Sequence, residues 1–124
     1  MLAQVLNRTI KAGGTTFDWR NQEFLLPDNY WYFPRWPEHT AIVTQNNLAV
    51  ELQLFITEHE ALLAQDDMYL GTWHNPLNDR YYIDIICRER NKNRAIQLAK
   101  QYSKQGGRAI VSIYNPKLKQ TISL

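Results

Sequence analysis

The stretch from residue 81 to residue 113 constrains the fold most, because its pattern predicts a strand, a helix and a second strand in succession. Apolar residues alternate through "YYIDIIC" (81–87), as they do in a strand whose two faces differ. "NKNRAIQLAKQYSKQGG" (91–107) has the helical period instead, with asparagines to cap its start and glycines to close its end. "RAIVSIYN" (108–115) is rich in β-forming residues. A strand–helix–strand unit of this length suits a crossover that packs one helix on a sheet.

A second helix and a hairpin precede this stretch. In "NNLAVELQLFITEHEALLAQ" (46–65) apolar residues recur every three or four positions, which predicts a helix with one buried face. "MYLGTWHNPLNDRYYIDIIC" (68–87) predicts a β-hairpin, since "NPLND" supplies turn residues between two β-forming runs. We therefore expect helices near 47–64 and 92–105, strands at 69–74, 81–87 and 108–114, and a core containing Leu52, Phe55, Leu62, Ile83, Ile85, Leu98 and Val111.

Short strands are predicted toward both ends of the chain, where β-forming runs are separated by turn residues. The predicted fold is α+β: a single domain, residues 1–124, with a single mostly antiparallel sheet and two helices packed on one face. The additional strands are "TTFDW" (15–19), "EFLL" (23–26), "YWYF" (30–33), "TAIV" (40–43) and the alternating, lysine-bearing "PKLKQTISL" (116–124).

The amino-acid composition indicates what class of protein this is but says little about its function. A chain of 124 residues suits one domain, and its 44% of hydrophobic residues argues against disorder. The one cysteine, Cys87, excludes an internal disulfide and fits a reducing compartment. The opening "MLAQVLNRTIKAGG" places its basic residues after the apolar ones, the reverse of a signal peptide. Because no run approaches the ~20 apolar residues of a membrane span, a cytoplasmic protein without membrane contact is expected.

Three motifs spread along the chain carry a resemblance to a known set of proteins. They are "GGTTFDWRNQEFLLPDNYWY", "YLGTWHNP" followed by "YYIDI", and "NRAIQLAKQYSKQGGRAIVSIYN". In this respect the chain resembles a set of small uncharacterised proteins of bacteria and phages, some of which occur beside or within phage head-associated proteins. Their pattern is a glycine pair that opens an N-terminal hairpin, an "LGTW" hairpin that ends in an aspartate, and a helix before a closing strand. The resemblance implies a phage-associated protein or a bacterial accessory factor, with no catalytic residues to carry over.

The run "NYWYFPRWPEH" (29–39) holds five aromatic residues in eleven positions and is the first candidate surface. A strand sends alternate residues to opposite faces, so we expect this run mainly to pack, with one set of residues 30–33 buried and the other outward. Trp36, which lies between two prolines, is expected to be substantially exposed. An outward aromatic set favours a small non-enzymatic interaction protein that contacts a protein partner. The candidate partner-binding residues are Tyr30, Trp31, Tyr32, Arg35 and Trp36.

Positive charge in the second half of the chain supplies the alternative function, nucleic-acid binding. Residues 1–65 hold four Lys/Arg and seven Asp/Glu, a net charge of −3, whereas residues 66–124 hold ten and five, a net charge of +5. "RERNKNR" (88–94) places four basic residues where they can contact phosphates. No stacking aromatic residue is interleaved with them in the sequence, so a solvated loop competes with this interpretation. The candidate nucleic-acid-binding residues are Arg88, Arg90, Lys92, Arg94, Lys100 and Lys104.

The motifs predict no catalytic residue, metal site or cofactor. His39, His59 and His74 lack the spacing of zinc ligands, and the glycine pair lacks the lysine of a phosphate-binding loop. Nothing places a base beside Cys87, and a lone carboxylate such as Asp84 does not make a mechanism. The remaining enzymatic alternative is a site assembled in space from Trp73, His74, Asp79 and Asp84.

Overall fold

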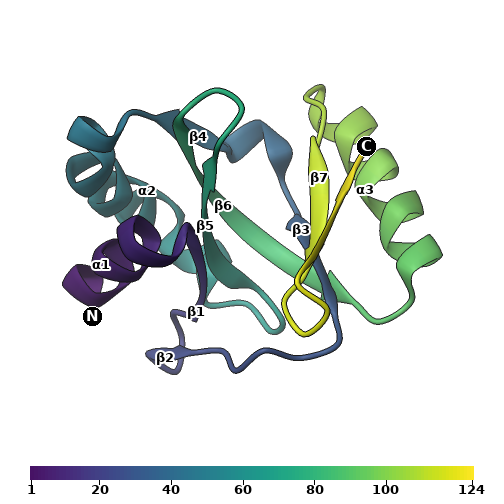
Figure 1. Cartoon of the computed structure of the whole chain (residues 1–124), viewed down its shortest axis with the longest axis horizontal. Helices are drawn as coiled ribbons and strands as arrows, with labels where there is room; N and C mark the ends of the chain where they lie inside the picture. Colours follow the sequence, from purple (N-terminus) through teal and green to yellow (C-terminus); the bar gives the residue numbers. More distant parts are fainter. The chain divides into compact units, whose positions relative to one another are not determined.

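A computed structural model describes all residues, 1–124, and contains three α-helices and one eight-stranded antiparallel sheet (Figure 1). The strand order is β2-β1-β5-β6-β3-β7-β8, with β4 paired to β6 beside that path. The predicted α+β class with one antiparallel sheet is confirmed. The helices are α1 (Leu2–Ala12), α2 (Leu48–Leu63) and α3 (Lys92–Gly106). The strands are β1 (Gly14–Asp18), β2 (Glu23–Phe24), β3 (Trp31–Pro34), β4 (Ala41–Val43), β5 (Tyr69–Asn75), β6 (Arg80–Glu89), β7 (Ser112–Asn115) and β8 (Gln120–Ser123).

The chain forms two compact units, and each unit is built from two separate stretches of sequence. The first unit comprises Met1–Leu25 and Thr40–Ile85, and the second comprises Leu26–His39 and Ile86–Leu124. Strand β6 contributes residues to both units, because the boundary falls within it. Helices α1 and α2 belong to the first unit and α3 to the second, so the predicted sharing of one face by two helices stays a prediction, as does the single domain.

The first unit packs α1 and α2 with β1, β2, β4, β5 and the first part of β6. β1 pairs antiparallel with β5, with Gly14 opposite Trp73, and β4 pairs with residues 81–83 of β6. The β1–β5 approach requires a glycine, since an added Cβ at Gly14 would lie 2.7 Å from the carbonyl oxygen of Thr72. The fully buried core of this unit includes Val5, Phe17, Leu48, Leu52, Leu63, Leu70, Ile83 and Ile85.

Helix α1 is a correction to the predicted set of two helices. Its buried residues, Val5 and Thr9, lie one turn apart. The Thr9 hydroxyl donates to the Val5 carbonyl oxygen at 2.7 Å and lies 2.6 Å from the Thr72 hydroxyl of β5. Gly13 ends the helix in the left-handed conformation, with φ of 84°. The two glycines that were expected to open a hairpin therefore have different roles: Gly13 ends helix α1 and Gly14 begins strand β1.

In the second unit α3 packs on β3 and β7, and the sheet is extended by β8 and by the end of β6. β3 is antiparallel to both β6 and β7, so those two strands run parallel with β3 between them. The predicted strand–helix–strand unit is thus present, with a third strand inserted. Asn91 caps α3 by accepting a hydrogen bond from the Arg94 backbone N–H, and Gly107 closes the helix with φ of 67°. The buried residues of the second unit include Trp31, Tyr32, Phe33, Cys87, Ala95, Ala99, Ile110, Ile113 and Asn115.

The predicted core is confirmed in part. Leu52, Phe55, Ile83 and Ile85 are buried, whereas Leu62 and Leu98 are only partly buried. The prediction that Val111 belongs to the core is wrong, because this residue is 46% exposed. The Ile110 backbone N–H donates to the Ser103 hydroxyl at the end of α3, and Ile110 is buried there. Val111 therefore turns outward, and β7 begins at Ser112 rather than at 108.

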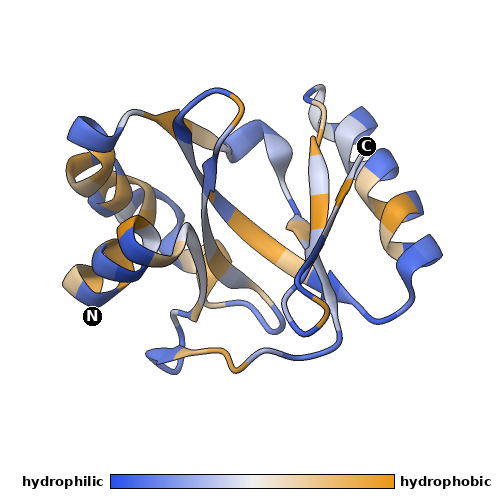
Figure 2. Cartoon of the chain, viewed as in Figure 1, coloured by the Kyte–Doolittle hydropathy of each residue, from blue (hydrophilic) through white to orange (hydrophobic).

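No helix is both long enough and apolar enough to cross a membrane. Apolar residues concentrate instead along the middle of β6, which is coloured as hydrophobic in Figure 2. This distribution agrees with the burial of Ile83, Ile85 and Ile86.

Candidate functional site

The aromatic and basic runs, which lie far apart in the sequence, meet at one end of the second unit. β3 pairs with β6 so that Tyr32 stands directly opposite Arg88. Arg88 Nη1 donates to Asp28 Oδ2 at 2.8 Å, and the Tyr32 hydroxyl lies 2.9 Å from both carboxylate oxygens of Asp28. The carboxylate of Asp28 thus fixes one arginine and one tyrosine, and both of its partners come from the candidate residues.

The ring of Tyr30 is contacted by two guanidinium groups. Arg88 Cζ lies 4.4 Å from the ring centroid and Arg90 Cζ lies 5.0 Å from it. Arg90 Nη2 also donates to the Tyr30 hydroxyl at 3.1 Å. Because an aromatic face attracts a cation, these contacts hold both arginines beside Tyr30 at the surface. Interleaved aromatic and basic side chains, which the linear sequence lacks, are therefore created by strand pairing.

The charges of this cluster do not cancel. Asp28 offsets Arg88, whereas the exposed Arg90 bonds a neutral hydroxyl. Burial raises the pKa of Tyr32 well above its ordinary value; Arg88 opposes that shift and Asp28 adds to it. Tyr32 therefore stays a neutral donor to Asp28 at physiological pH, and the carboxylate keeps its hold on Arg88.

Two further segments reach the same end of the unit. The Lys117 backbone N–H donates to the Asp28 carbonyl oxygen at 3.3 Å, which places the β7–β8 turn beside Asp28. Helix α3 begins directly after the cap Asn91 and has no acidic residue in its first turn. Figure 2 shows the end of β6, the following loop and the start of α3 as one hydrophilic stretch. We define the basic end of the second unit as Tyr30, Arg88, Arg90, Lys92 and Arg94.

The other candidate basic residues, Lys100 and Lys104, are exposed but lie farther along α3. At about 1.5 Å per residue, they are roughly 12 Å and 18 Å along the helix from Lys92. The structure therefore gathers four of the six candidate cations at the basic end and leaves these two outside it. Glu89 is the one acidic residue in the segment 88–94, and its side chain accepts a hydrogen bond from the Asn91 backbone N–H.

The candidate partner-binding residues do not form one exposed surface. Trp31 and Tyr32 are 4% and 5% exposed, and Phe33 is 1% exposed, so members of both alternating sets are buried, whereas only one set was expected to be. Trp36 is partly buried, short of the substantial exposure expected. Arg35 covers two rings, with its Cζ 4.9 Å from the Trp36 centroid and 4.2 Å from the centroid of Tyr102 in α3. The run packs mainly, as expected.

The residues of the enzymatic alternative fall into separate contacts. His74 Nε2 lies 2.8 Å from Asp79 Oδ1 at the β5–β6 turn. Trp73, the neighbouring residue, points to the opposite face and packs on Tyr82, with ring centroids 5.3 Å apart. Asp84 accepts a hydrogen bond from the Thr40 hydroxyl. The structure brings together one His–Asp pair and gives it no neighbouring nucleophile among these residues.

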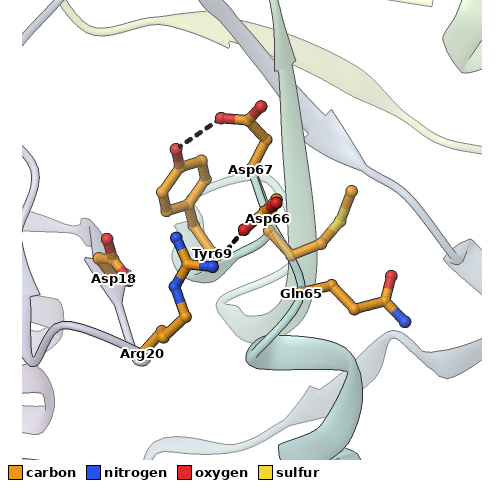
Figure 3. Close-up of a pocket in the computed structure, with 7 residues that line it drawn as sticks. Asp18, Arg20, Gln65, Asp66, Asp67 and Tyr69 are labelled. Atoms are coloured by element: carbon orange, nitrogen blue, oxygen red, sulfur yellow. Dashed lines mark hydrogen bonds and ion pairs between the residues drawn. The ribbon is translucent and has the colours of Figure 1, made fainter.

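A cavity of about 200 Å³ lies in the first unit, where the β1–β2 turn approaches the loop between α2 and β5 (Figure 3). Arg20 forms an ion pair with Asp66, and this hydrogen bond raises the pKa of Arg20. The Tyr69 hydroxyl donates to Asp67, and Asp18 accepts from the backbone and side chain of Asn21. The Arg20–Asp66 ion pair joins the two segments, and the other hydrogen bonds stay within each of them.

Cys87 is a buried free thiol. Its Sγ lies 3.6 Å from the Phe33 carbonyl oxygen, and burial raises the pKa of the thiol to about 12. No group of three His, Cys, Asp or Glu side chains in residues 1–124 is arranged to hold a metal ion.

No protein-family model matches the chain, and neither does any curated protein or solved structure with which it was compared. The resemblance to small proteins of bacteria and phages stays a prediction, and the function must be argued from the basic end.

Proposed function

We propose that the basic end of the second unit binds the phosphate backbone of a nucleic acid. The observation that supports this most is the position of its cations. Arg90 directly precedes the cap residue Asn91, and Lys92 and Arg94 belong to the first turn of α3, whose free N–H groups already carry positive partial charge. Cations there oppose the helix dipole and one another, which costs stability in the free protein. A bound anion reverses that cost, because a helix N-terminus and arginines both favour phosphate.

The net charge of the whole second unit points the same way. It holds ten Lys/Arg and three Asp/Glu, a net charge of +7, whereas the first unit holds four and nine, a net charge of −5. Positive and negative charge are therefore separated more completely between the two units than between the two halves of the sequence. A field of this sign raises the local concentration of polyanions and speeds their association.

Contact with a protein partner, the other proposed role, receives less support from the same surface. Its aromatic residues would have to be accessible, and Trp31 and Tyr32 are buried. Both proposals make the protein a non-enzymatic interaction module, and phage association and a cytoplasmic location are compatible with either.

The salt dependence of binding tests the proposal. A fluorescent 20-mer duplex should bind the intact protein, with log affinity falling by about 0.9 per phosphate contacted for each unit of log salt. Arg90→Ala with Arg94→Ala should reduce that slope by about two. The matched control is Lys100→Ala with Lys104→Ala, which removes the same charge from the same unit but away from the basic end.

Two results would contradict the proposal. One is the absence of binding by the intact protein to duplex and single-stranded oligonucleotides at low salt. The other is an equal loss of affinity in both double variants, since this would attribute binding to net charge alone rather than to the basic end.

A further inference from the structure

The sheet of the second unit has one face turned away from α3. Side chains directly opposite each other on paired antiparallel strands share a face. Arg88, Tyr32 and Tyr114 are successive partners across β6, β3 and β7, so they form one row. Phe33, the residue after Tyr32, points the other way, and its ring lies 6.1 Å from the ring of Tyr102 in α3. The row therefore lies on the face opposite the helix.

Two aromatic rings remain accessible on that face. Tyr114 is 42% exposed. Tyr30 is partly exposed and precedes Tyr32 by two residues, which places it on the same face, as its contacts with Arg88 and Arg90 also require. Two residues along one strand and one step across the sheet separate the Cα atoms of Tyr30 and Tyr114 by roughly 8 Å. Tyr32 lies between them, buried beneath Arg88 and Asp28.

We infer that the ligand of the basic end is a single-stranded nucleic acid whose neighbouring bases stack on Tyr30 and Tyr114; this rests on the proposed nucleic-acid binding. Accessible aromatic rings on an open sheet face are a platform for unpaired bases. A duplex keeps its bases paired and stacked within the helix, so it cannot place them on these rings.

The charged side chains complete the fit. Arg88 is fixed by Asp28 next to the row, and Arg90 lies over the Tyr30 ring, so both can reach the phosphates that flank a stacked base. The guanidinium of Arg90 is itself planar and stacks on bases, so an incoming base replaces or extends a contact already present on Tyr30. The occupant is thus specified by two features together, aromatic rings and positive charge on one face.

Fluorescence anisotropy with a labelled 12-mer of deoxythymidine, against a mixed-sequence 12-bp duplex, tests the inference on the intact protein. The single strand should bind at least tenfold more tightly. Tyr30→Ala and Tyr114→Ala should each weaken single-strand binding by about 5- to 150-fold, the range for loss of one stacked base. Tyr30→Phe and Tyr114→Phe should retain it, because the ring rather than the hydroxyl makes the stack. Val111→Ala is the matched control, an exposed apolar residue of the same unit.

The outcomes separate the two proposals. Equal affinities for strand and duplex, with both Tyr→Ala variants unchanged and Arg90→Ala with Arg94→Ala weakened, would overturn base stacking and leave phosphate binding intact. No binding of either oligonucleotide would overturn both. If a Tyr→Ala variant loses structure by circular dichroism, the strand–duplex comparison on the unmodified protein and the Tyr→Phe variants still decide.

Discussion

The two units use the same architecture, helices on antiparallel strands, but they use charge in opposite ways. In the first unit several carboxylates bond groups of the same unit: Asp18 holds a turn, Asp66 binds Arg20, Asp79 lies against His74, and Asp84 accepts from Thr40. The second unit contains only three acidic residues and ten basic ones. The difference teaches that net charge alone does not identify a ligand site. What marks the basic end is a cation, Arg90, that is held by the ring and hydroxyl of Tyr30 rather than by an acid.

The largest effects are expected in the two cores, which should be equally sensitive. Leu52 of the first unit and Ile113 of the second are fully buried, so Leu52→Ala and Ile113→Ala should each lower the free energy of unfolding by about 2–5 kcal/mol. Leu54→Ala and Val111→Ala are controls at roughly half-exposed neighbours and should cost less than about 0.5 kcal/mol. Urea denaturation followed by circular dichroism measures all four. A buried residue that costs no more than its control would mean that its element faces the wrong way.

The next largest effects are expected when an acidic residue is neutralised, and they should differ between the two units. Asp28→Asn should lower the free energy of unfolding by about 1–3 kcal/mol, since a partly buried carboxylate loses charge-assisted hydrogen bonds to Arg88 and Tyr32. The same change should strengthen oligonucleotide binding, because it removes a negative charge beside the basic end. Asp66→Asn in the first unit, whose partner Arg20 is exposed, should change neither quantity measurably. Parallel losses in stability and affinity after Asp28→Asn would show that Asp28 acts only through folding.

Alkaline pH should weaken the second unit through Cys87. Its folded pKa is raised from 9.0 to about 12, so above pH 9 the unfolded chain releases a proton that the folded protein retains. Stability from this thiol is complete below pH 9 and is lost as pH rises toward 12. Between pH 9 and pH 10.5 the unmodified protein should lose about 1–2 kcal/mol more than Cys87→Ala, as measured by urea denaturation. Identical pH profiles for the two proteins would contradict the burial of this thiol.

The smallest expected effects are in two turns, one in each unit. Gln22 has φ of 56° and Lys119 has φ of 52°, a conformation that glycine adopts at lower cost. Gln22→Gly and Lys119→Gly should each raise the free energy of unfolding by up to about 1 kcal/mol. Thermal denaturation would show this as a higher midpoint. A lower midpoint for Lys119→Gly alone would indicate that its side chain, rather than its backbone, stabilises the β7–β8 turn.

Local patterns in the sequence predicted most of the fold, because each depends on neighbouring residues. The helices near 47–64 and 92–105 and the hairpin at 68–87 were found from period and turn chemistry. Helix α1 was missed although Val5 and Thr9 lie one turn apart, because the following glycine pair resembles a hairpin signal as much as a helix end. Val111 was misplaced because the bond between Ile110 and Ser103, which sets where β7 begins, joins residues that no local pattern links.

The candidate site was less predictable, because its geometry depends on strand register. Arg88 and Arg90 were chosen for their charge and Tyr30 for its aromatic ring, yet their contact follows only from the pairing of β3 with β6. Pairing across so many residues leaves no trace in either segment alone. The burial of Tyr32 has the same origin, since its hydroxyl reaches an aspartate and its strand lies between two others.

The interleaving of the two units has a consequence for synthesis of the chain. The first unit has all its residues once Ile85 has been made, but β3 must wait for partners on β6 and β7. At about 5–20 residues per second, roughly 4–16 s pass between translation of Phe33 and translation of Tyr114. During that interval a nascent chain carries the apolar strand Trp31–Phe33 without its full set of partner strands, so this strand is where a ribosome-bound chaperone would be needed most.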